Sequence, residues 1–232
     1  MRLSILIRSA LSYKFRQILS RRKPEEETIE ELSEIASNYL YKDVLQFERL
    51  KRPDLLFNLL KALALQIGGE VSFQELSRLL GTSVHTIKRY IELLEQSFVI
   101  FRLNSLSGNL RNEISKGQKI YFNDIGIRNA IIQNFSPLST RNDVGALWEN
   151  FCISERFKYH SNQGQTVNAY FWRSYFSREV DYIEEKDGLI TAFEFKYSPK
   201  RNAQLPNIFR QAYPDAIFKV VNNNNYISEL FF

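Results

Sequence analysis

The stretch of residues 192–197 places two charged side chains inside an apolar run, and this constrains the fold more than any other part of the sequence. If the run is a β-strand, Glu194 and Lys196 point to one face of the sheet, and Phe193 and Phe195 point to the other. Burying a charged pair without partners costs several kcal/mol. The pair must therefore be paired internally, exposed to water or bound to a metal ion. The same spacing is also common in plain solvated ion pairs on strands.

The run of residues 178–183 predicts a second strand, which carries Asp181. The turn between the two strands contains the pair Asp187-Gly188, which is favoured in β-hairpins. We therefore expect Asp181 to approach Glu194 across a hairpin. On the alternating pattern of a strand, one face would carry Glu179, Asp181 and Ile183.

Six elements are predicted around this hairpin, in the order α-β-β-β-α-β. The helices span residues 143–160 and 202–213, and the strands span residues 167–172, 178–185, 189–197 and 216–221. Glu149 and Asn150 interrupt the apolar stripe of the first helix. The expected fold class is therefore α+β or α/β.

This order resembles the PD-(D/E)XK restriction-endonuclease-like core. The resemblance implies that Asp181 and Glu194 ligate a metal ion, that Lys196 is the catalytic lysine, and that Glu149 is an auxiliary carboxylate on the first helix. The expected cofactor is Mg2+, because it keeps several waters and needs only one or two carboxylates plus a substrate phosphate. One departure is that no proline precedes Asp181. Since many proteins of this fold bind without cutting, catalysis is left open.

The middle of the chain predicts a helix-turn-helix. A helix over residues 72–80 begins at a serine cap and is followed by the turn Gly81-Thr82-Ser83 and a second helix from Val84. Strands over residues 98–103 and 119–122 would form a hairpin wing. We therefore predict three parts: a helical amino-terminal segment (1–52), a winged helix (53–125) and a PD-(D/E)XK nuclease-like domain (126–232).

The outward positions of the second helix favour contact with double-stranded DNA. These side chains suit base edges and phosphates in a major groove. Cations on the helix and the wing would neutralise phosphates, which dominates non-specific affinity. The expected DNA-binding residues are His85, Thr86, Lys88, Arg89, Arg102 and Arg111. The alternatives are a protein-interaction module and a structural spacer, because a basic outer face is often only a solvated face.

Composition agrees with a cytoplasmic protein that meets polyanions. The net charge is +5 with a pI near 9.2, and the single cysteine, Cys152, excludes an internal disulfide. Residues 1–24 predict a basic amphipathic helix, which suits an anionic membrane, a partner or the chain's own domains. No run is long and apolar enough for a transmembrane segment, and no signal peptide is evident.

Several motifs in fixed order resemble the carboxy-terminal half of a prokaryotic family of AAA-type ATP-binding proteins. They are the hexads 39–44, 121–126 and 145–150 and the triplets 179–181 and 194–196. The ATPase core of that family is missing, since no Gly-rich loop ending in Gly-Lys-Ser/Thr occurs. We expect no ATP site and no ATP hydrolysis by this chain alone. We therefore expect a truncated relative, a fragment of a split gene or a stand-alone module.

Two functions follow as hypotheses. The first is a DNA-associated protein whose nuclease-like domain holds Mg2+ and cleaves phosphodiesters. The second is a non-catalytic adaptor for another protein, such as a separately encoded ATPase. A structure with Asp181 and Glu194 on opposite sheet faces would argue against the enzyme.

Overall fold

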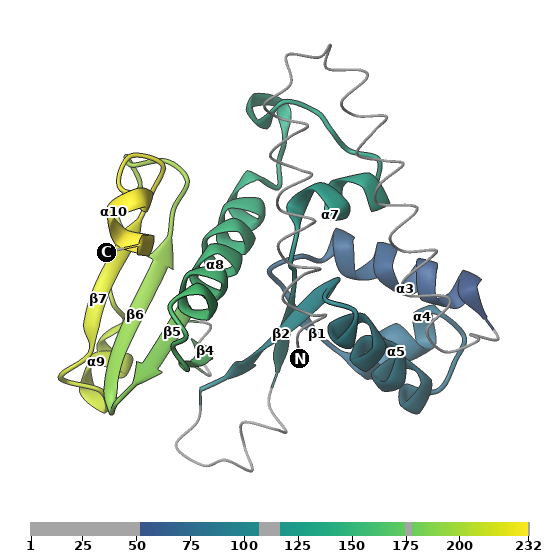
Figure 1. Cartoon of the computed structure of the whole chain (residues 1–232), viewed down its shortest axis with the longest axis horizontal. Helices are drawn as coiled ribbons and strands as arrows, with labels where there is room; N and C mark the ends of the chain where they lie inside the picture. The colour runs from purple at the N-terminus through teal and green to yellow at the C-terminus, as the bar shows by residue number, and fades with distance from the viewer. Residues whose placement is uncertain (1–51, 107–116, 175–177, 232) are drawn as a thin grey trace. The chain divides into compact units, whose positions relative to one another are not determined.

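The computed structural model describes residues 52–106, 117–174 and 178–231. Their contacts divide them into two compact units (Figure 1). Unit 1 comprises residues 52–65, 73–100 and 124–136, and unit 2 comprises residues 66–72, 101–106, 117–123, 137–174 and 178–231. The predicted amino-terminal segment, apart from Arg52, and the predicted DNA contact Arg111 lie outside the described residues.

Unit 1 contains four helices in its described part. They are α3 (Pro53–Leu65), α4 (Phe73–Leu79), α5 (Val84–Gln96) and α7 (Ile125–Ile131). The two helices of the predicted helix-turn-helix are α4 and α5, which pack together. Gly81 has a φ of +60° in the turn between them, a conformation that glycine adopts without strain. The Ser83 side chain then caps α5 by accepting a hydrogen bond from the Thr86 amide at 3.1 Å.

A buried arginine joins two other helices of unit 1. The Asp124 side chain caps α7 by accepting from the amides of Gly126 and Ile127 at 2.7 and 3.2 Å. That cap positions Arg128, which is 2% exposed and donates from Nε to the Ala64 carbonyl at 2.9 Å. The end of α3 thereby gains a charged donor for one of its free carbonyls.

Unit 2 is built on a mixed seven-stranded sheet, of which Ile100 alone is assigned to unit 1. The strands are β1 (Glu70–Val71), β2 (Ile100–Ser105), β3 (Gln118–Phe122), β4 (Asn168–Arg173), β5 (Glu179–Lys186), β6 (Leu189–Phe195) and β7 (Ile217–Val221), in the order β1-β3-β2-β4-β5-β6-β7. β2 and β4 run parallel, as do β6 and β7, whereas β5 is antiparallel to both neighbours. The strands expected to form the wing are β2 and β3, and both belong to the sheet of unit 2. The domain boundary expected at residue 125 therefore does not separate these two strands from the carboxy-terminal sheet.

Three helices and a short 3-10 turn complete unit 2: α8 (Val144–Asn162), α9 (Asn207–Ala212), α10 (Tyr226–Phe231) and η2 (Leu138–Thr140). The elements α8, β4, β5, β6, α9 and β7 follow the expected α-β-β-β-α-β order. The helix expected over residues 202–213 begins only at Asn207, because Pro206 disfavours helical backbone at the residue before it.

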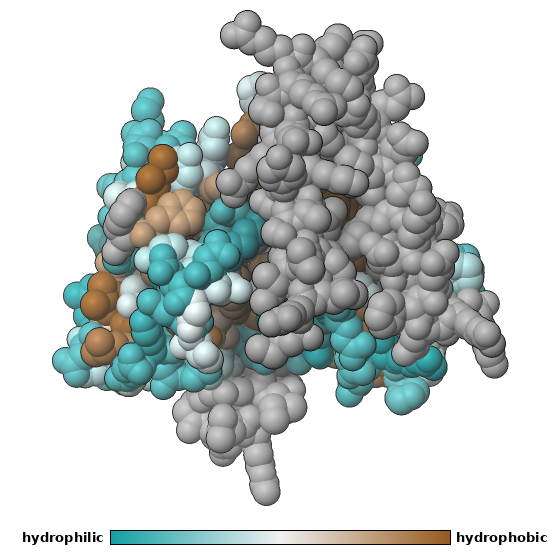
Figure 2. All heavy atoms as spheres, in the orientation of Figure 1, coloured by the Kyte–Doolittle hydropathy of each residue, from teal (hydrophilic) through white to brown (hydrophobic). Residues whose placement is uncertain are grey.

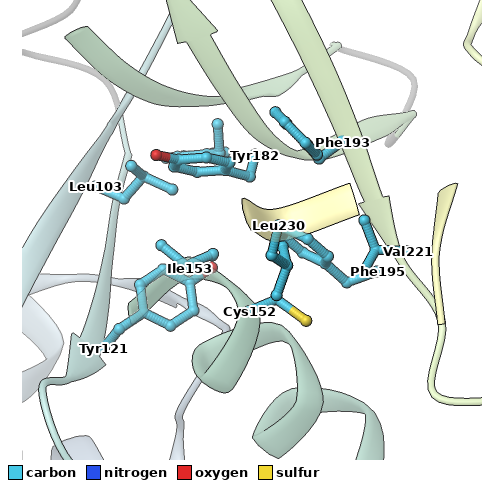
Figure 3. Packing of buried hydrophobic residues seen from close by; sticks show 10 residues of the cluster. Leu103, Tyr121, Cys152, Ile153, Tyr182, Phe193, Phe195, Val221 and Leu230 are labelled. Atoms are coloured by element: carbon cyan, nitrogen blue, oxygen red, sulfur yellow. The ribbon is translucent and has the colours of Figure 1, made fainter. Parts of the chain in front are cut away.

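The sheet of unit 2 is covered on both faces. On one face, Cys152 and Ile153 of α8 and Leu230 of α10 pack against strand residues that include Phe193 and Phe195 (Figure 3). On the other face, Leu205 and Phe209 pack against Val180, Ile183 and Ala192. The arrangement is a three-layer α/β/α sandwich, in which the alternating apolar residues of β5 and β6 serve both cores.

A β-bulge corrects the expected alternation on β5. The pairing with β4 steps from Tyr170↔Ile183 to Trp172↔Val180, so β5 contributes one extra residue. Val180 and Ile183 consequently share the α9 side of the sheet. The expectation that Ile183 lies on the face of Asp181 is wrong, because the bulge falls between them.

Surface hydrophobic residues of unit 2 lie among hydrophilic ones. Ile208, Ile217 and Ile227 are about half exposed, on α9, β7 and α10. Figure 2 shows brown residues separated by teal ones over this part of the molecule. Such scattered exposure is ordinary for folded proteins. None of the described helices is long and apolar enough to cross a membrane.

Candidate functional site

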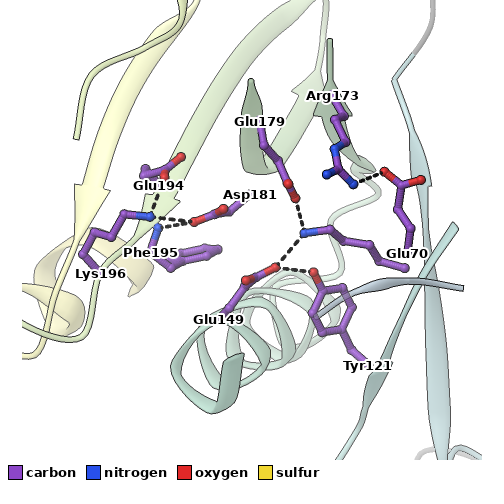
Figure 4. Close-up of polar contacts among 10 residues, drawn as sticks. Glu70, Tyr121, Glu149, Arg173, Glu179, Asp181, Glu194, Phe195 and Lys196 are labelled. Carbon is purple, nitrogen blue, oxygen red and sulfur yellow. Dashed lines mark hydrogen bonds and ion pairs between the residues drawn. The ribbon is translucent and has the colours of Figure 1, made fainter. Parts of the chain in front are cut away.

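The sequence-predicted residues of β5 and β6 meet at one end of the hairpin (Figure 4). Lys196 Nζ lies 2.5 Å from Glu194 Oε1 and 3.8 Å from Asp181 Oδ2. The hairpin turn has the expected form, since Asp187 and Gly188 both have positive φ. That turn fixes the register in which the lysine and the two carboxylates come together.

The way the two strands separate explains this meeting. The ladder pairs Tyr182 with Phe193, and beyond that pair the Asp181 carboxylate accepts the amide hydrogen of Phe195 at 2.8 Å. Asp181 therefore lies at the end of the ladder, close to Glu194 through their shared lysine. Asp181 and Glu194 therefore share one lysine and are not separated on opposite faces of the sheet. Such a separation is the arrangement that would have argued against an enzyme.

A second group of charges, which the sequence analysis missed, adjoins the first. Lys119 of β3 is 3% exposed, and its Nζ lies 3.0 Å from Glu149 Oε1 and pairs with Glu179. The Tyr121 hydroxyl donates to the same Glu149 oxygen at 2.5 Å. Lys119 also lies over the Phe171 ring, at 5.4 Å from its centroid. The available signal was the spacing of Lys119 and Tyr121, which puts both on one face of a strand.

The expected auxiliary carboxylate, Glu149, thus lies between β3 and the hairpin site. Burial raises its pKa to about 7, and the charge of Asp181 adds to this, while Lys119 and Tyr121 oppose it. Burial also raises the pKa of Asp181, although the nearby Lys196 and the Phe195 amide favour its charged form. The pKa of Glu194 is raised by burial and by the charge of Asp181.

Each lysine of the site is held charged by its carboxylates. Burial alone would lower the pKa of Lys196, but Asp181 and Glu194 outweigh it and the pKa is raised. Glu149 and Glu179 likewise outweigh burial and raise the pKa of Lys119. Four carboxylates and two lysines leave a formal charge of −2 when all are ionised. The site therefore favours an additional cation or bound protons.

The donor set suits Mg2+ better than a transition metal. Asp181 and Glu194 supply oxygen ligands, and two carboxylates with waters suffice for this ion. Among the described residues, no three His, Cys, Asp or Glu side chains gather into a metal-holding group. In this arrangement Lys196 occupies the position between the two carboxylates, so a metal ion there would require its ammonium group to move.

A buried amide fixes the helix that carries Glu149. Asn150 is fully buried, and its Oδ1 accepts from the Phe122 amide while its Nδ2 donates to the Phe122 carbonyl, both at 2.8 Å. The side-chain amide of Asn150 thus forms the two hydrogen bonds that a neighbouring strand would form with Phe122 of β3. Asn150 explains the polar interruption in the apolar stripe of α8, and it holds Glu149 opposite Lys119.

We expect Asn150→Ala to lower the free energy of unfolding of unit 2 by about 2–4 kcal/mol, because two buried backbone groups lose their partner. Urea titration followed by tryptophan fluorescence measures this, since both tryptophans, Trp148 and Trp172, lie in unit 2. Asn162→Ala is the matched control at the exposed end of the same helix, and it should change stability by less than about 0.5 kcal/mol. Equal effects of the two substitutions would contradict the assigned role.

Two turns further along α8 lies a second buried ionic cluster, also missed by the sequence analysis. Arg156 donates to Glu184 of β5 through Nε at 2.7 Å and through Nη2 at 2.6 Å, and its Nη1 donates to the Leu230 carbonyl at 2.5 Å. His160 Nε2 lies 3.0 Å from the same carboxylate. These contacts tie α8, β5 and α10 together, so this cluster is structural.

The residues expected to bind DNA are only partly brought together. His85, Lys88 and Arg89 are exposed on α5, while Thr86 is half-buried with its Oγ1 2.9 Å from Ser83 Oγ in the helix cap. Arg102 lies on β2 in unit 2 and is half-buried. α5 therefore presents His85, Lys88 and Arg89 at its surface together with Glu92, and Arg102 belongs to the other unit.

Comparisons with known proteins identify matching families and relatives, and none of them has an assigned activity. Residues 144–229 match the model described as Domain of unknown function (DUF4143). The "Uncharacterized protein Rv2008c" of Mycobacterium tuberculosis and the "Uncharacterized protein Mb2031c" of Mycobacterium bovis are each 27% identical over 124 residues, which cover 53% of this chain and 27% of the relative. The chain therefore spans about a quarter of the length of these relatives. No solved structure matches it. The model described as Domain of unknown function (DUF8612) matches residues 17–138, more than half of the 232 residues, and the chain belongs to that family.

Proposed function

We propose that the chain is a DNA-associated protein whose unit 2 is a nuclease-like domain, with Asp181 and Glu194 holding Mg2+ and Lys196 acting in phosphodiester cleavage. The observation that carries this proposal is the meeting of these three side chains at the end of the β5–β6 hairpin. The restriction-endonuclease-like order of elements supports it. The excess negative charge around them favours a divalent cation.

The chain's own residues would divide the work as follows. A bound metal ion would supply Lewis-acid activation of water and shielding of the phosphate. Lys196 would donate hydrogen bonds to the attacking oxygen or to the negative charge that develops on the phosphate. Glu149 has a pKa near neutrality, which suits proton exchange at physiological pH. Lys119 would hold Glu149 in place from β3.

DNA would be held by unit 1 in this proposal. The helices α4 and α5 follow the helix-turn-helix pattern, whereas the strands expected as the wing, β2 and β3, belong to the sheet of unit 2. The exposed cations Lys88 and Arg89 of α5 would contact phosphates. The order of motifs resembles that of AAA-type proteins, which suggests a separately encoded ATPase as a further partner. The single cysteine suits the reducing conditions of the cytoplasm.

A non-catalytic adaptor is the second candidate function, and one observation favours it. The 2.5 Å contact between Lys196 and Glu194 is an internal ion pair that can cap the carboxylates without any metal ion. In an adaptor this pair would be permanent, and the site would only stabilise the end of the hairpin. The two candidates therefore differ in whether a divalent ion displaces the lysine.

Cleavage of supercoiled plasmid by the purified chain with Mg2+ or Mn2+, beside an EDTA control, tests the proposal. Lys196→Ala should reduce the rate by about 100-fold or more, as removal of one transition-state donor commonly does. Lys158→Ala removes a half-exposed lysine of α8 that pairs with Glu155, away from the candidate site, and should cleave like the wild type. Urea titration should show that Lys196→Ala still unfolds cooperatively, and Lys158→Ala should unfold at the wild-type urea concentration.

Two results would decide against cleavage. Equal nicking by the wild type and Lys196→Ala would indicate a contaminating nuclease. No nicking with either ion, and no shift of the unfolding midpoint by Mn2+, would leave the adaptor as the better account.

A further inference from the structure

An aromatic cluster adjoins the carboxylate site. Trp148 directly precedes Glu149, and Tyr197 directly follows Lys196. The rings of these two residues meet edge to face at 5.6 Å, and Trp148 also packs on Phe151 at 5.5 Å and Tyr226 at 5.6 Å. We call these four residues, Trp148, Phe151, Tyr197 and Tyr226, the aromatic shelf.

The shelf is held rigidly, yet its outer member reaches the surface. The Trp148 indole donates to the Val221 carbonyl at 3.4 Å, and the Tyr197 carbonyl accepts from the Asn223 amide at 3.3 Å. Tyr197 nevertheless keeps 36% of its surface exposed, whereas Phe193 and Phe195 on the preceding strand are buried. Burial in the core therefore does not account for an aromatic side chain at position 197.

Positive charge follows the shelf along the chain. Residues 195–214 contain four Lys or Arg and no Asp or Glu. Lys200 and Arg201 are exposed in a turn around Ser198, whose Oγ and carbonyl accept from their amides at 3.4 and 3.2 Å. Four residues span at most about 14 Å, so Lys200 lies within two nucleotide lengths of Lys196. The charge beside the shelf is complementary to phosphates.

We propose that the aromatic shelf binds an unpaired DNA strand, with a base stacked on Tyr197 and flanking phosphates contacted by Lys200 and Arg201. An aromatic face beside a basic groove is the usual arrangement in proteins that bind single strands. A base inside a duplex has no free face, and unstacking it costs a few kcal/mol. The inference rests on the proposed function only in naming DNA, and it identifies single-stranded ends or gaps as the preferred substrate.

Binding is measured in EDTA, where no metal-dependent cleavage occurs, by the anisotropy of labelled 12-nucleotide oligothymidylate and of a blunt 12-base-pair duplex. The wild type should bind the single strand more tightly. Tyr197→Ala should weaken that binding by about 5- to 100-fold, while Tyr197→Phe, which keeps the ring, should stay within about twofold. Lys200→Ala/Arg201→Ala should reduce its salt dependence, and Lys158→Ala should not.

A second readout comes from Trp148 itself. In a Trp172→Phe background, oligothymidylate should change the fluorescence of Trp148, since its ring contacts Tyr197. Unchanged binding by Tyr197→Ala, an unchanged signal or tighter binding of the duplex would overturn the proposal. Oligouridylate of equal length separates the two strand chemistries, and a preference for it would overturn the assignment to DNA. Because no assay needs cleavage, an inactive plasmid result leaves these outcomes intact.

Discussion

Replacement of Arg156 by methionine is expected to lower the free energy of unfolding of unit 2 by about 3–5 kcal/mol at pH 7, because it leaves the buried Glu184 carboxylate without its cation. Glu184 and Arg156 have side chains only 8% and 10% exposed. Methionine keeps most of the apolar volume of the arginine, so lost packing is a minor contribution. The loss should therefore report the uncompensated charge and the unpaired Leu230 carbonyl.

The double variant Arg156→Met/Glu184→Leu separates these contributions. Replacing both members of a buried ion pair by apolar residues is often neutral, so most of the loss should be recovered. His160 remains, with its Nδ1 3.2 Å from Gln165 Oε1. Urea titration with tryptophan fluorescence gives the free energies of unfolding of the wild type, the two single variants and the double variant. A double variant as unstable as Arg156→Met would show that the charge is not the cause.

The pH dependence provides an independent check on the same cluster. Although burial alone would raise it, the hydrogen bonds from Arg156 and the charges of Arg156 and His160 lower the pKa of Glu184 below its ordinary value of 4.5. A group with a lowered folded-state pKa adds stability above its unfolded pKa and loses it as the pH falls through the folded value. This part of the stability should be present at pH 7 and fade only in acid, below about pH 4.5.

The sequence predicted the hairpin site for reasons that are local. The Asp-Gly pair specifies a tight turn, and the alternation of β6 places Phe193 and Phe195 in the core, which leaves Glu194 for the strand end. Once the turn is fixed, Asp181 can only lie near Glu194. Such a prediction needs nothing beyond the period of a strand and one turn type.

The missed residues depend on contacts between distant segments. Lys119 reaches Glu149 and Glu179 because β3 joins the sheet of unit 2, whereas the sequence assigned β3 to a separate wing. Arg156 pairs with Glu184 across 28 residues, and in the sequence each looks like a solvated charge. The bulge in β5 was also missed, since nothing in an alternating run marks an extra residue.

The stability of unit 2 is expected to fall as the pH rises from about 4.5 to about 7, and Glu149 is the main cause. Its pKa is raised from 4.5 to about 7, chiefly by burial. In that interval only the folded state keeps the proton, so the unfolded state gains stability relative to it as the pH rises. The difference corresponds to at most about 3 kcal/mol. The raised pKa values of Asp181 and Glu194 act in the same direction.

Glu149→Gln should remove most of this slope, because the amide keeps an acceptor for Lys119 and Tyr121 but does not titrate. Lys119→Met should steepen the slope and carry it to higher pH, since the ammonium group that favours ionised Glu149 is gone. Glu155→Gln is the matched control, on the same helix but paired with the surface residue Lys158. Urea titrations from pH 5 to 8 give the slopes, and this window excludes the acid loss assigned to Glu184. An unchanged slope in Glu149→Gln would show that Glu149 does not hold a proton in the folded state, and it would leave the lysine bridge of Asp181 and Glu194 as the source of any pH dependence.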